Sequence, residues 1–294
     1  MQLVTFSDAQ GMRIGILDKT AASVIDLSRA APALPRDMNE LVALGSAGVE
    51  QLRAAAASDH RVPLASVKLN APLPHPKRNI FAVGKNYRTH ASEFENSGFD
   101  ATGGQAVPDL PIFFTKATSS VSGPGDAIPI DLDYTDSTDY EGELTVVIGE
   151  GGRGIRKADA LKHVYGYTII NDATARTLQS AHKQWFLGKS LDGYCPMGPT
   201  LVTVDEIPDL GKLRLMTRVN GDLRQDAMVS DLIFDVPTLI ETLSSVMTLM
   251  PGDLIATGTT SGVGLGFKPP KFLKKGDVVA ITIEPIGTLE NPVA

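Results

Sequence analysis

Short apolar runs rich in Val, Ile and Leu recur along the chain and predict many short β-strands. Helical periodicity is rarer, and long helices do not alternate with the strands as they would in a doubly wound sheet. The predicted strands are Leu3–Phe6, Arg13–Leu17, Ala22–Asp26, Ile80–Val83, Ile112–Thr115, Leu144–Ile148, Tyr165–Ile170, Arg214–Val219, Leu254–Ala256 and Val278–Ile283. The predicted helices are Asp37–Leu44, Val49–Ala57, Lys157–His163, Ala173–Ser180 and Val236–Met247. This pattern predicts a β-rich α+β fold, built as a β-sandwich or roll with peripheral helices.

A cluster of prolines divides the chain near residue 75. Pro63, Pro72, Pro74 and Pro76 lie close together, and proline removes backbone donors and disfavours helix. The cluster therefore predicts a linker or crossing segment. We expect a small N-terminal α+β domain over residues 1–75 and a larger β-rich domain over residues 76–294.

Composition narrows the class of protein. The chain has 294 residues, 43% of them hydrophobic, and a net charge of −7, which argues against a nucleic-acid partner. No apolar run approaches the roughly 20 residues that span a bilayer, and the first residues lack the pattern of a signal peptide. Cys195 is the single cysteine, so no intrachain disulfide forms, and we expect it in the core. We therefore expect a cytoplasmic protein with no membrane partner.

Two glutamates mark the start of an apolar strand. In Asp139–Ile148, Glu141 and Glu143 precede or begin the run Leu144–Ile148. Residues two apart point to the same face of a strand, so these carboxylates project together. A cation between them would relieve their repulsion and the cost of burying them. The alternative is a solvated edge strand with two surface glutamates.

A third carboxylate, Asp172, follows the apolar run Tyr165–Ile170 and precedes the predicted helix Ala173–Ser180. It could cap that helix. It could also join Glu141 and Glu143 in a site of three carboxylates without a cysteine or a histidine. Such a set favours Mg²⁺, Mn²⁺ or Ca²⁺ over zinc or copper.

His90 and Glu93 form the candidate acid–base pair. In a helix their i,i+3 spacing puts both side chains on one face, where the carboxylate would orient the imidazole as a general base. A pair at this spacing can equally be a surface contact. The segment Ser97–Pro111, rich in glycine and proline, follows directly and predicts a mobile lid.

Two further segments suggest anion binding. Gly188-Lys189-Ser190 resembles part of a phosphate loop, but Lys183 stands where that pattern requires glycine. Lys189 can instead stabilise an enolate or oxyanion, or it can be an exposed lysine. The loop Thr257–Gly264 offers backbone N–H groups to an anion such as a substrate carboxylate, or is an ordinary turn.

Over roughly residues 78–292 the chain resembles the fumarylacetoacetate hydrolase superfamily. The matching segments are Gly84–Glu93, Asp139–Gly149, Gly166–Gln179, Gln184–Pro199, Val219–Gln225, Ile255–Gly264 and Ile286–Val293. The resemblance implies a mixed β-sandwich roll with a smaller N-terminal domain, assembled as a homodimer. It implies Mg²⁺ or Mn²⁺ on Glu141, Glu143 and Asp172, a His90–Glu93 dyad on a lid element, and Lys189 beside metal and substrate. It also implies that Lys116, Gln179, Gln225 and Thr259 line the substrate pocket.

The resemblance implies a metal-dependent hydrolase that cleaves a C–C bond in a small 1,3-dioxo acid, such as an acylpyruvate or a fumarylacetoacetate-like compound. The metal would stabilise the enolate that forms when the bond breaks, and His90 would activate water. The same site could decarboxylate oxaloacetate, or isomerise or hydrate an oxo-diene acid, since a superfamily match does not select among these reactions. A third hypothesis is a β-rich binding module with a structural calcium site.

Overall fold

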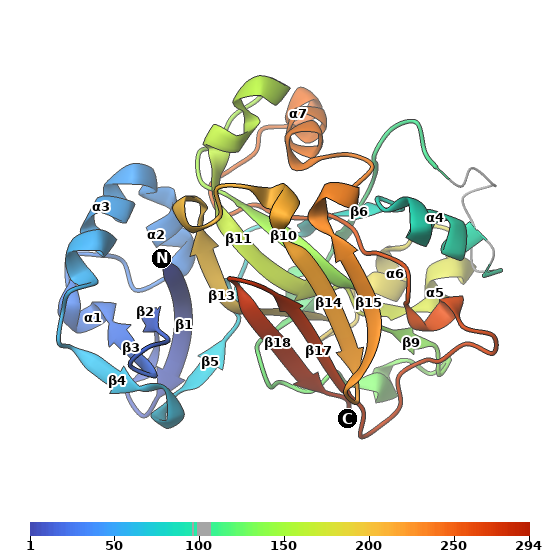
Figure 1. Cartoon of the computed structure of the whole chain (residues 1–294), viewed down its shortest axis with the longest axis horizontal. Helices are drawn as coiled ribbons and strands as arrows, with labels where there is room; N and C mark the ends of the chain where they lie inside the picture. The colour runs from blue at the N-terminus through green and yellow to red at the C-terminus, as the bar shows by residue number, and fades with distance from the viewer. Residues whose placement is uncertain (96, 99–106) are drawn as a thin grey trace.

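The computed structural model describes residues 1–95, 97–98 and 107–294, which form three β-sheets with short helices around them (Figure 1). The strands are β1 (Gln2–Asp8), β2 (Gly11–Asp18), β3 (Ser23–Asp26), β4 (Arg61–Pro63), β5 (Lys68–Asn70), β6 (Ile80–Gly84), β7 (Ile112–Lys116), β8 (Val121–Ser122), β9 (Thr138–Asp139), β10 (Gly142–Ile148), β11 (Val164–Asn171), β12 (Thr174–Ala175), β13 (Cys195–Thr203), β14 (Arg214–Val219), β15 (Asp222–Met228), β16 (Leu254–Ala256), β17 (Val278–Ile283) and β18 (Gly287–Pro292). The helices are α1 (Leu27–Ala30), α2 (Met38–Ala43), α3 (Gly45–Ala55), α4 (Arg88–Glu95), α5 (Arg176–Ala181), α6 (Phe186–Lys189) and α7 (Val236–Val246).

Within the described residues, the larger sheet has twelve strands in the main order β4-β3-β2-β1-β13-β11-β10-β16-β6-β7, with β5 beside β1 and β8 beside β13. It is a mixed sheet, because β16 and β6 run parallel, as do β13 and β8, whereas its other pairs are antiparallel. A second sheet, called the smaller sheet, has four antiparallel strands in the order β15-β14-β17-β18. Strands β9 and β12 form a separate two-stranded sheet. The predicted strand-rich α+β fold is confirmed.

Strand β10 lies at the centre of the molecule, and its two faces meet different parts of the core. Leu144, Val146 and Ile148 share one cluster with residues of β14, β17 and α7, whereas Val147 faces the cluster that includes the N-terminal strands and helices. This alternation is the period of two expected of a strand. Because both faces are covered, side chains at the start of β10 are buried whichever way they point.

The N-terminal strands extend the larger sheet. Strand β1 pairs with β13, with Leu3 opposite Leu201, and β2, β3 and β4 continue outward from it (blue in Figure 1). Of the clustered prolines, Pro72, Pro74 and Pro76 lie between β5 and β6, whereas Pro63 is the last residue of β4. The division into domains over 1–75 and 76–294 stays a prediction.

The structure differs from the predicted elements at several positions. Strand β13 was not predicted, because Pro196, Gly198 and Pro199 within it are residues that usually mark strand edges or breaks. The helix predicted over Lys157–His163 is present with those bounds and is of the 3₁₀ type. The helix predicted from Ala173 begins at Arg176, after the short strand β12.

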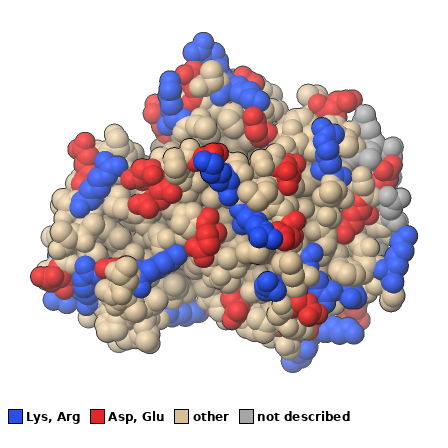
Figure 2. All heavy atoms as spheres, in the orientation of Figure 1, with Lys and Arg blue, Asp and Glu red and all other residues tan. Residues whose placement is uncertain are grey.

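The surface in Figure 2 carries basic and acidic side chains interspersed, without a large field of one sign on that face. Among the described residues, no helix combines the length and apolar character needed to cross a bilayer.

Candidate metal centre and catalytic pocket

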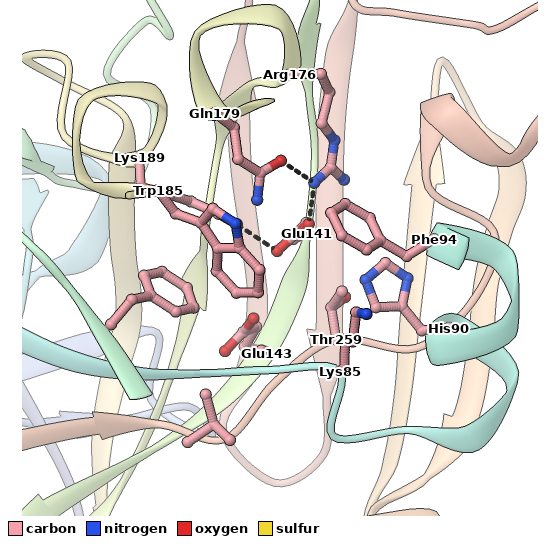
Figure 3. A pocket seen from close by; sticks show the side chains of 13 residues that line it. Lys85, His90, Phe94, Glu141, Glu143, Arg176, Gln179, Trp185, Lys189 and Thr259 are labelled. Carbon is pink, nitrogen blue, oxygen red and sulfur yellow. Dashed lines mark hydrogen bonds and ion pairs between the residues drawn. The ribbon is translucent and has the colours of Figure 1, made fainter. Parts of the chain in front are cut away.

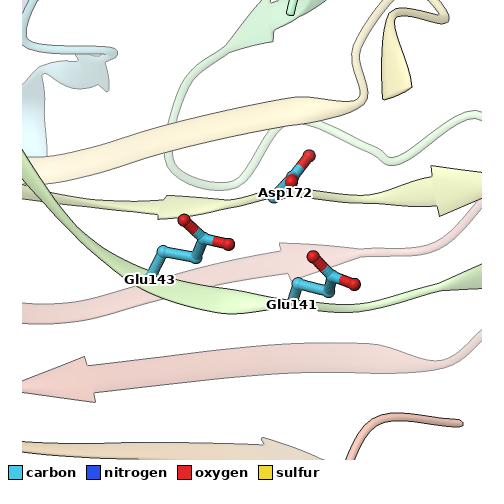
Figure 4. Close-up of side chains that lie close together, drawn as sticks. All are labelled: Glu141, Glu143 and Asp172. Atoms are coloured by element: carbon cyan, nitrogen blue, oxygen red, sulfur yellow. The ribbon is translucent and has the colours of Figure 1, made fainter. Parts of the chain in front are cut away.

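Three buried carboxylates converge where β10 and β11 meet (Figure 4). Glu141 directly precedes β10, Glu143 is its second residue, and Asp172 directly follows β11. The antiparallel pairing of the two strands continues past their ends, since the Asp172 amide donates to the Glu141 carbonyl at 2.8 Å. One carboxylate oxygen from each residue lies within 4.8 Å of the others.

Burial decides between the alternatives that the sequence left open for these residues. Glu141, Glu143 and Asp172 are 4%, 1% and 0% exposed, so the two glutamates are not surface residues of an edge strand. Asp172 does not cap α5, because that helix has Ala175 at its N-cap. Burying three adjacent carboxylates costs free energy unless cations compensate them.

Cationic side chains surround two of the three carboxylates. The Lys189 Nζ lies 2.7 Å from both Glu141 Oε2 and Asp172 Oδ2. Lys116 Nζ lies 2.6 Å from Asp172 Oδ1, and Arg176 Nη1 lies 2.6 Å from Glu141 Oε1. Although burial works against ionisation, Lys189 and Arg176 hold the pKa of Glu141 below its usual range.

The negative charge of Glu143 is the least compensated by cationic side chains. In the described part of the chain no lysine or arginine pairs with it, and its Oε2 accepts from the Gly258 amide at 2.8 Å. Burial, together with the charges of Asp172 and Glu141, raises the pKa of Glu143 well above its usual range. A divalent cation would remove this penalty, and the all-oxygen donor set fits Mg²⁺, Mn²⁺ or Ca²⁺. The residues present therefore fit a hard metal ion.

The candidate dyad lies on α4. His90 Nδ1 is 3.2 Å from Glu93 Oε2, as the i,i+3 spacing predicts, and His90 is buried. Glu93 Oε1 accepts from the Gly262 amide at 3.0 Å, so the carboxylate is held from both sides. Figure 3 shows His90 reaching from α4 toward the cavity that Glu141 also faces. His90 is therefore one of the residues that line this cavity.

A cavity lies between His90 of the dyad and the two glutamates (Figure 3). Its lining residues are Val83, Gly84, Lys85, His90, Phe94, Phe114, Glu141, Glu143, Arg176, Gln179, Trp185, Lys189 and Thr259. One part is polar and charged. The rest is aromatic, because Trp185 packs edge-on against Phe94 and Phe114 at ring-centroid distances of 6.0 and 5.3 Å. Such a cavity suits a small anionic molecule with an apolar portion.

The residues expected to bind substrate fall into two groups. Gln179 and Thr259 line the cavity. Lys116 is buried behind it, where its Nζ donates to the carbonyls of Ala173 and Lys189. Gln225 is also buried, with its amide bonded to the protein. The functional roles of all four stay predictions.

The sequence left two interpretations of the loop Thr257–Gly264 open, an anion site for a substrate and an ordinary turn. In the structure, the amides of Gly258, Gly262 and Gly264 donate to carboxylates of the protein: those of Glu143, Glu93 and Asp139. The loop therefore connects one of the three clustered carboxylates, Glu143, with the Glu93 carboxylate of the dyad. The predicted lid, Ser97–Pro111, lies largely outside the described residues, at positions 99–106.

Sequence reasoning missed the buried pair formed by Arg176 and Asp139. Arg176 Nε lies 2.9 Å from Asp139 Oδ2, and both side chains are fully buried. Arg176 also donates to Gln179 Oε1 at 3.2 Å. The i,i+3 spacing of Arg176 and Gln179 in a predicted helix was the one available signal. Trp185 also lines the cavity.

Comparison with known proteins identifies the family. Residues 79–294 match the family described as fumarylacetoacetate (FAA) hydrolase C-terminal. This chain belongs to that family.

Individual relatives agree with this assignment. The chain is 55% identical over 230 residues to the oxaloacetate tautomerase YisK of Bacillus subtilis (strain 168), covering 78% of this chain and 74% of that protein. The fumarylacetoacetate hydrolase EaFAH from psychrophilic Exiguobacterium antarcticum superposes with a TM-score of 0.81 at 40% identity, covering 100% of this chain and 99% of that one. Maleylpyruvate hydrolase from Sphingobium sp. SYK-6, in complex with manganese (II) ion and pyruvate, superposes with a TM-score of 0.80 at 31% identity, covering 100% and 99%. These relatives are hydrolases and a tautomerase, so the family is one of enzymes.

Proposed function

We propose that this chain is a divalent-metal-dependent enzyme that forms and protonates the enolate of a small 2-oxo acid, and that its reaction is the keto–enol tautomerisation of an oxaloacetate-like substrate. The observation that carries the proposal is the cluster of Glu141, Glu143 and Asp172, of which the two glutamates line the cavity that Lys189 and His90 also line. The 55% identity to an oxaloacetate tautomerase supports the choice of reaction.

The site has the parts that enolisation requires. A divalent cation held by the three carboxylates supplies a Lewis acid for the 2-oxo group. His90, with Nδ1 toward Glu93, presents Nε2 to the substrate as the proton acceptor at C3. The Lys189 ammonium lies beside the metal-binding carboxylates, where it offsets negative charge on the enolate oxygen. Returning the proton to oxygen or to carbon completes the isomerisation, with no co-reactant consumed.

Hydrolysis of a C–C bond in an acylpyruvate-type 1,3-dioxo acid is the second candidate. It uses the same enolate, but His90 would activate a water molecule that attacks the distal carbonyl. The similarity to a maleylpyruvate hydrolase with bound manganese and pyruvate favours this candidate. Enolisation needs no site for an attacking water, and for that reason we place it first.

A spectrophotometric assay with and without Mn²⁺ or Mg²⁺ separates the reactions. Oxaloacetate, acetylpyruvate and fumarylpyruvate are each supplied, the rate without enzyme is subtracted, and pyruvate and CO₂ are measured in parallel. Metal-dependent enol–keto conversion of oxaloacetate without pyruvate or CO₂ supports tautomerisation. Loss of a diketone with release of pyruvate would transfer the assignment to hydrolysis, and CO₂ release would transfer it to decarboxylation.

Matched variants test the site itself. Glu143→Gln keeps the shape of a buried metal-binding residue but removes its charge, and should abolish turnover. Glu284→Gln makes the same change at a side chain that is 72% exposed, and should leave turnover unchanged. Full activity in Glu143→Gln would refute the proposed metal centre. The proposal includes a homodimer, which light scattering on the purified protein tests.

A further inference from the structure

Gln225 lies behind the cavity rather than on its lining. It belongs to β15, an edge strand of the smaller sheet, where it pairs with Thr217 of β14, and it is fully buried. Its Oε1 accepts from the Gly142 amide at 3.0 Å. Its Nε2 donates to Thr259 Oγ1 at 2.7 Å and to the Thr260 carbonyl at 2.8 Å. Both ends of the side-chain amide are therefore bonded to the protein.

These bonds close a ring that includes Gly142, the residue between the candidate metal ligands Glu141 and Glu143. The Gly142 amide donates to Gln225, Gln225 donates to Thr259 Oγ1, and the Thr259 hydroxyl donates back to the Gly142 carbonyl at 2.9 Å. The ring thus holds the peptide groups on both sides of Gly142. Those two peptide groups carry Glu141 on one side and Glu143 on the other.

Strand geometry explains why the ring contacts Gly142. Glu141 and Glu143 face the cavity, so the residue between them faces the smaller sheet. A Cβ on Gly142 would lie 2.5 Å from Thr217 Oγ1 and 3.0 Å from Ile281 Cγ2, so glycine lets the backbone of β10 approach that sheet closely. Gln225 supplies a polar contact there and satisfies the buried Gly142 amide.

The same loop reaches the metal-binding carboxylates by a second route. Gly258, the neighbour of Thr259, donates its amide to Glu143 Oε2 at 2.8 Å. A shift of Thr259 would therefore change the position of Glu143 as well as the Gly142 peptides. Partners behind the ligands of a metal commonly set ligand orientation and metal affinity.

We propose that Gln225 is a positioning residue of the metal centre: through the ring with Thr259 and Gly142 it sets the spacing of Glu141 and Glu143, and it does not contact the substrate. The inference rests on the metal centre of the proposed function. It assigns Gln225 a role different from the substrate contact that the family resemblance implied.

The test measures Mn²⁺ binding directly, by titration calorimetry and by the electron paramagnetic resonance of free Mn²⁺, without substrate. Gln225→Met keeps the length of the side chain but removes both hydrogen-bonding ends. We expect its Kd for Mn²⁺ to rise about 10- to 100-fold. At saturating Mn²⁺ the KM for substrate should equal that of the wild type, because no substrate contact is lost.

A second variant, Thr259→Val, opens the same ring at another corner. It should also weaken Mn²⁺ binding. The Kd of the double variant for Mn²⁺ should be about that of the single variant with the higher Kd, because the second substitution acts on a ring that the first has already opened. Fold-changes that multiply in the double variant would overturn the ring as the cause. If Gln225→Met does not fold, Thr259→Val carries the test alone, and a wild-type Kd in that variant overturns the proposal.

Asn291→Leu is the matched control. Asn291 is a buried amide on β18 that donates to the carbonyls of Gly123 and Asp126, away from the carboxylates. Its loss should lower thermal stability and leave the Kd for Mn²⁺ unchanged. A Gln225→Met protein with a wild-type Kd and a raised KM would show a substrate contact instead. If the wild type does not bind Mn²⁺, the metal centre of the proposed function is refuted. If the wild type binds Mn²⁺ and the variants bind it equally well, only the role of Gln225 is refuted.

Discussion

Replacing Arg176 by methionine should destabilise the protein more than any surface substitution. The Arg176 side chain is fully buried, with Nε 2.9 Å from Asp139 Oδ2 and Nη1 2.6 Å from Glu141 Oε1. Methionine has a similar length but no charge. The Arg176→Met variant would therefore keep two buried carboxylates and lose the cation between them.

The magnitude follows from what each carboxylate would retain. Asp139 still accepts from the amides of Gly264 and Leu265, and Glu141 still pairs with Lys189. Breaking a buried ion pair by removing one partner costs about 3–5 kcal/mol. For a chain of this size each kcal/mol lowers the Tm by about 2 °C, so we expect a fall of roughly 6–10 °C.

Thermal unfolding followed by circular dichroism in metal-free buffer checks this value. Arg156→Met is the control, because Arg156 is 81% exposed and pairs with Asp159 in an i,i+3 contact on the surface. Such a pair contributes under about 1 kcal/mol. If Arg176→Met melts within a degree or two of Arg156→Met, the buried pair does not stabilise the fold and the reasoning is wrong.

Three other predictions test the metal centre, the Arg13–Asp26 ion pair of the N-terminal strands, and Cys195. Mn²⁺ at about 100 times its Kd should raise the free energy of unfolding by about 2.7 kcal/mol in the wild type and equally in His90→Ala. The same Mn²⁺ concentration should not change the free energy of unfolding of Glu143→Gln. His90→Ala should nevertheless lose about 10²- to 10⁴-fold in turnover, and retained turnover would remove His90 as the base. Burial opposes ionisation of Asp26, but hydrogen bonds from Ser28 and Arg13 hold its pKa below the usual value. The ionised carboxylate therefore stabilises the folded protein above about pH 3.9, and this stabilisation is lost as the pH falls through the pKa of the folded state. Asp26→Asn should therefore cost about 1–3 kcal/mol at pH 7 in denaturant titrations and progressively less in acid; a constant difference would contradict this. Burial raises the pKa of Cys195 to about 12, so a thiol reagent at pH 8 should modify it only after denaturation, and rapid reaction of the native protein would contradict its burial.

Local spacing was sufficient to predict the principal groups of the site. The two-residue period of a strand put Glu141 and Glu143 on one face, and the i,i+3 spacing of a helix put His90 beside Glu93. Both relations depend only on residues a few positions apart. The structure contains both.

Strands whose composition conflicts with strand preferences were not predictable in the same way. Strand β13 contains two prolines and a glycine, and β15 is largely polar. Strand β13 forms because it pairs with β1, β11 and β8, and β15 forms because it pairs with β14. Those pairings come from distant parts of the chain, and a scan of short windows does not contain them.

By itself, the sequence determined a strand-rich α+β fold, the paired glutamates, the His–Glu dyad and, through resemblance, the family. Only the tertiary structure decided that Lys189, 48 residues from Glu141, bridges it to Asp172, and that Gln225, 83 residues from Gly142, bonds to the backbone of β10. It also decided that the glycine loop directs its amides to protein carboxylates instead of a ligand. The physical reason is that hydrogen bonds and ion pairs act over a few ångströms. Backbone geometry predicts such contacts for neighbours in sequence, whereas for distant residues they exist only after the sheets have packed.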